Sequence, residues 1–87
     1  MYVIVVYDVS VEKVNKLRIF LKQYLNWVQN SVFEGEMTKA ELYTIEKNIK
    51  ELINPLSDSV RMYILRSDKY LEQKELGTSR VDLSDII

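Results

Sequence analysis

An uninterrupted apolar segment near the start of the chain, Tyr2 to Tyr7, constrains the fold more than any other part of the 87-residue sequence. Every residue in this segment is β-branched or aromatic. A strand with one face in water alternates apolar and polar side chains, so the run predicts a central strand buried on both faces. A membrane span needs about 20 apolar residues, and the run is too short to be one or to form a signal peptide.

Two stretches with helical spacing follow this strand. Ser10 is the expected N-cap of the first helix, which the apolar spacing extends to about Leu25. The second helix begins with a capping box formed by Thr38 and Glu41, and the pair Asn54-Pro55 ends it. The residues expected to face the core are Val14, Leu17, Phe20, Leu21, Tyr24 and Leu25 in the first helix and Leu42, Ile45, Ile49, Leu52 and Ile53 in the second.

The remaining strands complete the pattern. Residues 26–36 predict two short strands or one bent strand, Ser59 to Arg66 predicts a strand with one strongly apolar face, and an edge strand is expected near Leu76. This order of elements is that of the ferredoxin-like split βαβ fold. We therefore predict an α+β fold, a ferredoxin-like sandwich with one antiparallel sheet and two helices on one face, in a single domain over residues 1–87.

Two helices cover only one face of such a sheet. The first strand is apolar on both sides, because residues 3, 5 and 7 point one way and residues 2, 4 and 6 point the other. A monomer would then expose a large apolar patch, and a second copy related by a two-fold axis is the simplest partner to cover it. The sequence therefore predicts a homodimer.

The chain contains neither His nor Cys. This composition excludes His-based triads, thiolate nucleophiles and zinc sites built on either residue. Catalysis would have to use carboxylates, Lys, Tyr or Ser, or a hard metal ion bound by oxygen. The lack of Cys also fits a reducing compartment, so we expect a cytoplasmic protein with no membrane association.

Asp8 ends the apolar strand, on the same side as Ile4 and Val6. If that side is the dimer interface, the two-fold axis brings two Asp8 carboxylates together, and their repulsion favours a bound cation. Magnesium commonly takes one or two carboxylates, and a metal-activated water attacks a phosphodiester without help from His. The alternative is an ordinary capping or turn residue, since Asp is common where a strand leads into a helix.

The first helix carries four cations, Lys13, Lys16, Arg18 and Lys22, and the only acid between residues 10 and 33 is Glu12. Such a stripe can bind the phosphates of a nucleic acid, although the whole chain has a net charge of −1. The alternative is a solvated helix face. Arg18 borders the apolar stripe and is the cation expected to point toward the site.

Two aromatic residues and two acids are further candidates. Phe33 and Trp27 could stack on nucleic-acid bases, although apolar aromatic residues in strands usually belong to a core or an interface. Glu34 and Glu36 are either additional acids of the site or part of an exposed strand edge.

Three features occur together in the chain: an opening strand that ends in Tyr7-Asp8, a basic amphipathic helix, and the run VQNSVFEG at residues 28–35. Together they resemble the second family of CRISPR-associated proteins, the small ferredoxin-like partner of the CRISPR integrase. The similarity extends to the strand Ser59 to Arg66, and its most specific part is the run SVFEG at 31–35. In this family the metal ligand is an aspartate that closes the first strand, which is Asp8 here.

The resemblance implies a homodimer whose two Asp8 residues flank magnesium or manganese, and a role in spacer acquisition beside the CRISPR integrase. Some family members are metal-dependent endonucleases on RNA or DNA. By the same resemblance, Tyr7 and Ser31 are expected to position phosphate or water. The candidate catalytic set is therefore Asp8, Tyr7, Arg18, Ser31 and Phe33. Residues 68–87 are expected to provide an edge strand and a tail that contacts partners.

Three other functions remain open. The protein could be a non-catalytic adaptor that bridges integrase dimers on DNA, or a toxin-like messenger RNA nuclease of the same fold. A ferredoxin-like module that binds a metabolite at its dimer interface is the third alternative. The lack of a glycine-containing loop between the first strand and the first helix disfavours this last function.

Overall fold

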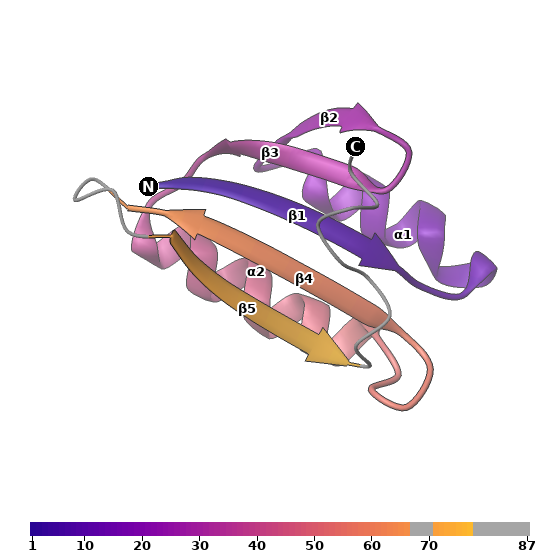
Figure 1. Ribbon diagram of the computed structural model, residues 1–87. Helices are drawn as coiled ribbons and strands as arrows, with labels where there is room; N and C mark the ends of the chain where they lie inside the picture. The colour runs from indigo at the N-terminus through magenta and orange to yellow at the C-terminus, as the bar shows by residue number, and fades with distance from the viewer. Residues whose placement is uncertain (67–70, 78–87) are drawn as a thin grey trace.

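β1 (Tyr2–Asp8) lies in the middle of a five-stranded antiparallel sheet whose strand order is β2-β3-β1-β4-β5 (Figure 1). The computed structural model describes residues 1–66 and 71–77. Both helices pack against the same face of the sheet. This is the predicted α+β, ferredoxin-like arrangement. The other elements in chain order are α1 (Val11–Leu21), β2 (Asn26–Gln29), β3 (Val32–Glu36), α2 (Lys39–Leu52), β4 (Ser59–Leu65) and β5 (Leu71–Gly77).

The helical face of the sheet carries the main hydrophobic core. Val3, Val5 and Tyr7 of β1 are at most 3% exposed, and they pack with residues from both helices and from the neighbouring strands. Each fully buried aliphatic side chain contributes about 2 kcal/mol of hydrophobic free energy, which favours the most apolar strand at the centre. Their buried partners include Leu17, Leu21, Phe33, Ile45, Ile49, Val60, Met62 and Ile64.

The opposite face carries a smaller apolar cluster. It consists of Val6, Val32 and Tyr63, which are between 3% and 5% exposed, with Ile4 packed against them. The expected large exposed patch on this face is therefore wrong, because Val6, Val32 and Tyr63 from three adjacent strands are buried in the folded chain. Leu65, at the end of β4, is a large hydrophobic residue that is exposed on this side.

α1 ends at Leu21, earlier than the predicted end near Leu25. The chain then tightens into a turn, where Gln23 N–H donates to the Phe20 carbonyl at 3.2 Å and Tyr24 N–H donates to the Leu21 carbonyl at 3.0 Å. Leu25 is buried, but it lies in the turn that leads into β2. The apolar spacing suggested a longer helix because Leu25, although it lies in the turn, is buried four residues after Leu21, as a helical residue would be.

α2 begins and ends where the sequence predicts. Glu41 N–H donates to Thr38 Oγ1 at 3.1 Å, and Thr38 N–H donates to Glu41 Oε1 at 2.9 Å. The capping box is therefore confirmed. At the other end, Asn54 lies in the turn before β4, where its side-chain oxygen accepts a hydrogen bond from Leu56 N–H at 3.0 Å.

Residues 26–36 form two strands, which resolves the alternative left open by the sequence. β2 pairs with β3, and the register shifts between Trp27 and Gln29. Asn30 lies in the connecting turn with a φ of 40°, in the left-handed region that Asn tolerates better than most residues. This turn places residues 29–31 beside the end of β1.

β5 is the edge strand that was expected near Leu76. It pairs with β4 and ends at Gly77, whose φ is 89°. A Cβ atom at Gly77 would overlap the carbonyl oxygen of Asp58, so the two strands approach closely at this end. The predicted partner-contacting tail beyond the strand, residues 78–87, lies outside the described residues.

Candidate functional site

Asp8 is exposed at the end of β1, where it pairs with Ser59 across the β1–β4 ladder. Because side chains alternate along a strand, Asp8 faces the same side as Ile4 and Val6, away from the helices. The sequence placed Asp8 at this position and on this face. Its role as a metal ligand stays a prediction.

An open hollow of about 210 Å³ lies beside Asp8. One wall is the end of β1, and the other is the turn between β2 and β3. Hydrogen bonds hold this turn in place, from Tyr7 N–H to the Ser31 carbonyl at 3.1 Å and from Trp27 Nε1–H to the Asn30 carbonyl at 3.0 Å. The lining residues are Val6, Tyr7, Asp8, Gln29, Asn30, Ser31 and Val32.

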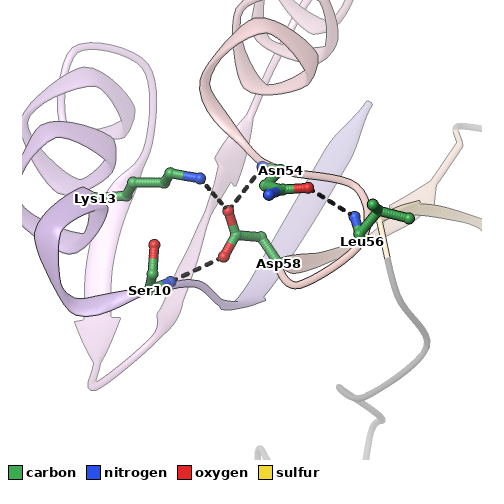
Figure 2. A network of polar contacts seen from close by, with 5 residues as sticks. All are labelled: Ser10, Lys13, Asn54, Leu56 and Asp58. Atoms are coloured by element: carbon green, nitrogen blue, oxygen red, sulfur yellow. Dashed lines mark hydrogen bonds and ion pairs between the residues drawn. The ribbon is translucent and has the colours of Figure 1, made fainter.

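A second aspartate, Asp58, lies one residue before the β4 partner of Asp8 and is fully buried. Its Oδ1 accepts a hydrogen bond from Ser10 N–H at 2.9 Å. Its Oδ2 accepts from Lys13 Nζ at 2.6 Å and from Asn54 N–H at 2.8 Å (Figure 2). One carboxylate therefore joins the β1–α1 connection, the first turn of α1 and the end of α2.

The protonation equilibrium of Asp58 reflects these contacts. Burial raises the pKa of Asp58, but the hydrogen bonds from Asn54, Lys13 and Ser10 and the positive charge of Lys13 lower it by more. The net pKa therefore lies below the ordinary value of 3.8. Asp58 is thus held as a carboxylate.

Asp58 also binds the backbone at the N-cap of α1. Ser10 is the N-cap residue, as predicted, but its hydroxyl makes no capping hydrogen bond. Asp58 accepts from the N–H of Ser10, which is a different contact from the side-chain cap expected of Ser10. This contact fixes the chain two residues after Asp8, so Asp58 is a positioning residue for the site. Sequence reasoning missed it because no local pattern marks it.

The oxygen donors beside Asp8 fit a hard cation. Carboxylate, amide and hydroxyl oxygens suit magnesium and manganese, and magnesium often keeps several waters with only one or two carboxylates. Within residues 1–66 and 71–77, no group of three or more His, Cys, Asp or Glu side chains is placed to hold a metal. Asp8 is the one acid lining the hollow in the described part of the chain.

The other members of the predicted catalytic set are placed differently. Ser31 is half-buried and lines the hollow. Tyr7 and Phe33 belong to the core, with ring centroids 6.2 Å apart. The Tyr7 hydroxyl is buried and Phe33 is 0% exposed, so neither ring is open to phosphate, water or a base in this conformation. Both rings support the strand end from the core side.

Glu34 and Glu36 lie away from Asp8. They pair in register with Ile4 and Tyr2, toward the opposite end of β1. Glu34 accepts a hydrogen bond from the Tyr2 hydroxyl, which is the first cause of the raised pKa of Tyr2. These two acids therefore do not join the Asp8 site. Glu36 is exposed, but β3 lies between β2 and β1, so the alternative of an exposed strand edge is wrong as well.

The four basic residues predicted on the first helix do not form one stripe, and Lys22 is the C-cap that follows α1. Lys13 is used internally by Asp58. Lys16 is exposed, on a part of the helix surface that it shares with Phe20 and residues of α2. Arg18 and Lys22 lie over the ring of Trp27 rather than beside Asp8. The expectation that Arg18 points toward Asp8 is therefore not met in the single chain.

Arg61 is a cation that sequence reasoning did not single out. It pairs in register with Val6 and shares the face of Asp8, one diagonal position away. Contacts with Tyr63 and Glu75 raise its pKa, so it is charged at any accessible pH. The alternation of side chains along the strand predicted at Ser59 to Arg66 indicates which face Arg61 lies on. Only the pairing of β4 with β1 shows that Arg61 lies near Asp8.

The fold and the site together define a class of protein, a small ferredoxin-like domain with an exposed aspartate at the end of its central strand. The family model described as CRISPR associated protein Cas2 matches residues 1–73. The chain is 58% identical to the CRISPR-associated endoribonuclease Cas2 of Methanosarcina acetivorans, over 100% of both chains. It is 51% identical to the protein of the same description from Pyrococcus furiosus, again over 100% of both.

Solved structures agree with this match. The crystal structure of Streptococcus pyogenes Cas2 at pH 6.5 superposes with a TM-score of 0.70 at 34% identity, covering 78% of this chain and 89% of that chain. A second Cas2 crystal structure gives a TM-score of 0.67 at 44% identity, covering 95% and 82%. The chain belongs to the Cas2 family of CRISPR-associated proteins, as the resemblance indicated. Among the described residues, no helix is both long and apolar enough to cross a membrane.

Proposed function

We propose that this Cas2 chain is a metal-dependent endoribonuclease that works as a homodimer in spacer acquisition. The observation that carries the proposal is the place of Asp8, which is exposed at the end of the central strand beside a hollow lined by oxygen-bearing side chains. The relatives from Methanosarcina and Pyrococcus, which are described as endoribonucleases, support RNA as the substrate. DNA is the alternative substrate.

Asp8 would hold magnesium or manganese, with Asn30 and Ser31 as neighbouring oxygen donors. A bound divalent ion supplies a water of lowered pKa and neutralises phosphate charge, so cleavage needs no His. In this scheme Ser31 orients water or phosphate through its hydroxyl. Asp58 fixes the backbone that follows Asp8, and Tyr7 N–H fixes the turn that carries Ser31.

A homodimer would add a second acid to the site. The hollow contains one carboxylate per chain among the described residues, and magnesium commonly takes one or two. On the face of Asp8, Leu65 is an exposed large apolar side chain that a partner could cover. A two-fold axis on this face would bring two Asp8 residues together. The CRISPR integrase is the expected second partner, and the cytoplasm the expected location.

The proposal is tested with purified protein and a labelled single-stranded RNA or double-stranded DNA, in magnesium, manganese or excess chelator. We expect cleavage with either metal, none with chelator, and a loss of at least about 100-fold in Asp8→Asn, because the metal loses its ligand. Glu36→Gln is the matched control, since it removes one exposed carboxylate at the other end of β1. Cleavage that survives chelation or Asp8→Asn would contradict the proposal.

A non-catalytic adaptor is the second candidate. The observation that favours it is the single carboxylate in the hollow, which is a small donor set for a nuclease metal. An adaptor predicts that wild-type protein binds integrase and DNA but leaves RNA and DNA intact in both metals. It also predicts that Asp8→Asn supports spacer integration as well as wild type does.

A further inference from the structure

Trp27 is the only tryptophan of the chain, and it is 47% exposed on the edge strand β2. Two cations lie over its ring, one from α1 and one from the residue that caps the C-terminal end of α1. The Arg18 Cζ is 4.8 Å from the ring centroid and the Lys22 Nζ is 5.1 Å from it. We call these three residues the tryptophan cluster.

The cations of the tryptophan cluster are not neutralised. In residues 1–66 and 71–77, neither Arg18 nor Lys22 forms an ion pair, and the buried Arg18 Nε has no hydrogen-bond partner. Four other cations of the described residues do have carboxylate partners, whereas Arg18 and Lys22 share the lack of one with several exposed lysines. Two uncompensated cations beside an exposed indole form a surface that suits an anion attached to an aromatic group. The four ion pairs formed by the other cations are Lys13–Asp58, Arg61–Glu75, Arg66–Glu72 and Lys74–Glu46.

We propose that the tryptophan cluster binds single-stranded nucleic acid, with one base packed against the exposed part of the Trp27 indole and the flanking phosphates on Arg18 and Lys22. The proposal deepens the function proposed above and rests on it, because it assigns a surface that binds the substrate outside the Asp8 hollow. Stacking on an exposed aromatic ring requires a base that is not already stacked in a duplex. The guanidinium of Arg18 is planar and can extend the same stack.

The tryptophan cluster is connected to the Asp8 hollow through the β2–β3 turn. Trp27 Nε1–H donates to the Asn30 carbonyl at 3.0 Å, and Asn30 lines the hollow. In register, Trp27 is opposite Phe33, which faces the helices, whereas Asp8 faces the other side. A strand bound at both places would pass around the edge of the sheet at β2 or over the β2–β3 turn.

This path discriminates between substrates. Duplex DNA has a persistence length of about 50 nm, so it does not bend around the edge of one small domain at low cost. A single strand is flexible and presents its bases. The cluster therefore selects single-stranded over duplex substrate.

Trp27 reports directly on this site, because no other residue contributes tryptophan fluorescence. Wild-type protein in chelator, which prevents cleavage, is titrated with a uridine-rich RNA, a thymidine-rich single-stranded DNA and a DNA duplex of equal length. We expect saturable quenching by one or both single strands and little by the duplex. Binding of single strands seen by anisotropy without any quenching, or equal binding of the duplex, would overturn the proposal.

Variants separate stacking from charge. Trp27→Leu should weaken single-strand binding about tenfold, as measured by anisotropy of a labelled oligonucleotide, and Trp27→Phe should restore most of it. Arg18→Gln with Lys22→Gln should weaken binding and reduce its salt dependence. The matched control, Lys47→Gln with Lys50→Gln on exposed positions of α2, should leave quenching unchanged. A control that lowers affinity as much as the cluster variant would contradict a specific site.

The test is independent of cleavage. If wild-type protein binds and quenches but cleaves neither RNA nor DNA, the nuclease proposal fails and the tryptophan cluster stands. If it cleaves but Trp27→Leu changes neither affinity nor KM for single strands, the cluster proposal fails and the nuclease stands.

Discussion

Asp8 and Asp58 are two aspartates at the same end of the sheet, and they differ in almost every other respect. Asp58 is 0% exposed and accepts hydrogen bonds from Ser10, Lys13 and Asn54. Asp8 is exposed and borders an open hollow. A buried carboxylate surrounded by donors contributes to the fold, whereas an exposed one is accessible to a ligand from solution. Exposure, rather than residue type, therefore separates the structural acid from the acid proposed as the metal ligand.

The largest effect on stability is expected for Asp58→Ala. The substitution leaves the Lys13 ammonium and two backbone N–H groups without their acceptor, and breaking a buried ion pair costs about 3 kcal/mol. Urea unfolding at a fixed protein concentration measures the change. A loss below about 1 kcal/mol would mean that water replaces the carboxylate, and that Asp58 is no more structural than Asp8.

Lys13→Met should have the next largest effect. It removes the charge opposite Asp58 but keeps the backbone donors from Ser10 and Asn54, and Lys13 itself is partly exposed. We expect a loss of about 1 to 2 kcal/mol. Lys16→Met, at an exposed position of the same helix, is the matched control and should cost less than about 0.5 kcal/mol. Equal losses in the two variants would argue that the Asp58 ion pair contributes nothing.

The pH dependence of stability should come from Asp58. Its pKa is lower in the folded protein than the ordinary 3.8, so the unfolded chain binds the proton more tightly. The stabilisation is then complete above about pH 5 and decreases as the pH falls through 4 and below. Denaturant unfolding of wild type and Asp58→Asn from pH 7 to pH 2 should show a gap that narrows on acidification. A gap that is constant with pH would contradict the assignment.

Asp8→Asn should have the smallest effect on stability, within about 0.5 kcal/mol, because the side chain is exposed. The same substitution should have the largest effect on cleavage. Thermal unfolding beside the activity assay measures both. A strongly destabilised Asp8→Asn would place Asp8 in the structural class with Asp58 and remove the contrast between them.

The sequence predicted the elements whose signals are local. The Thr38–Glu41 capping box and the pair Asn54-Pro55 lie at the ends of α2, so both ends could be read from adjacent residues. The unbroken apolar run likewise identified the central strand. Asp8 could be chosen because a lone carboxylate at the end of such a run is conspicuous.

What the sequence could not predict depends on contacts between distant residues. Lys13 and Asp58 are separated by 45 positions, and nothing near either residue indicates the pair. Because the sequence does not indicate this pair, Lys13 is predicted to bind nucleic acid, whereas in the structure it stabilises the fold through Asp58. Arg18 was expected near Asp8 for a similar reason, since only the packing of α1 on β2 places it over Trp27.

Gly77 ties the last described strand to Asp58. With its left-handed backbone and the Asp58 carbonyl oxygen where a Cβ would lie, position 77 has no room for an L-side chain. A library randomised at this codon and selected for folding should return almost only glycine. The exposed end of the edge strand β5 therefore tolerates fewer substitutions than exposed positions usually do.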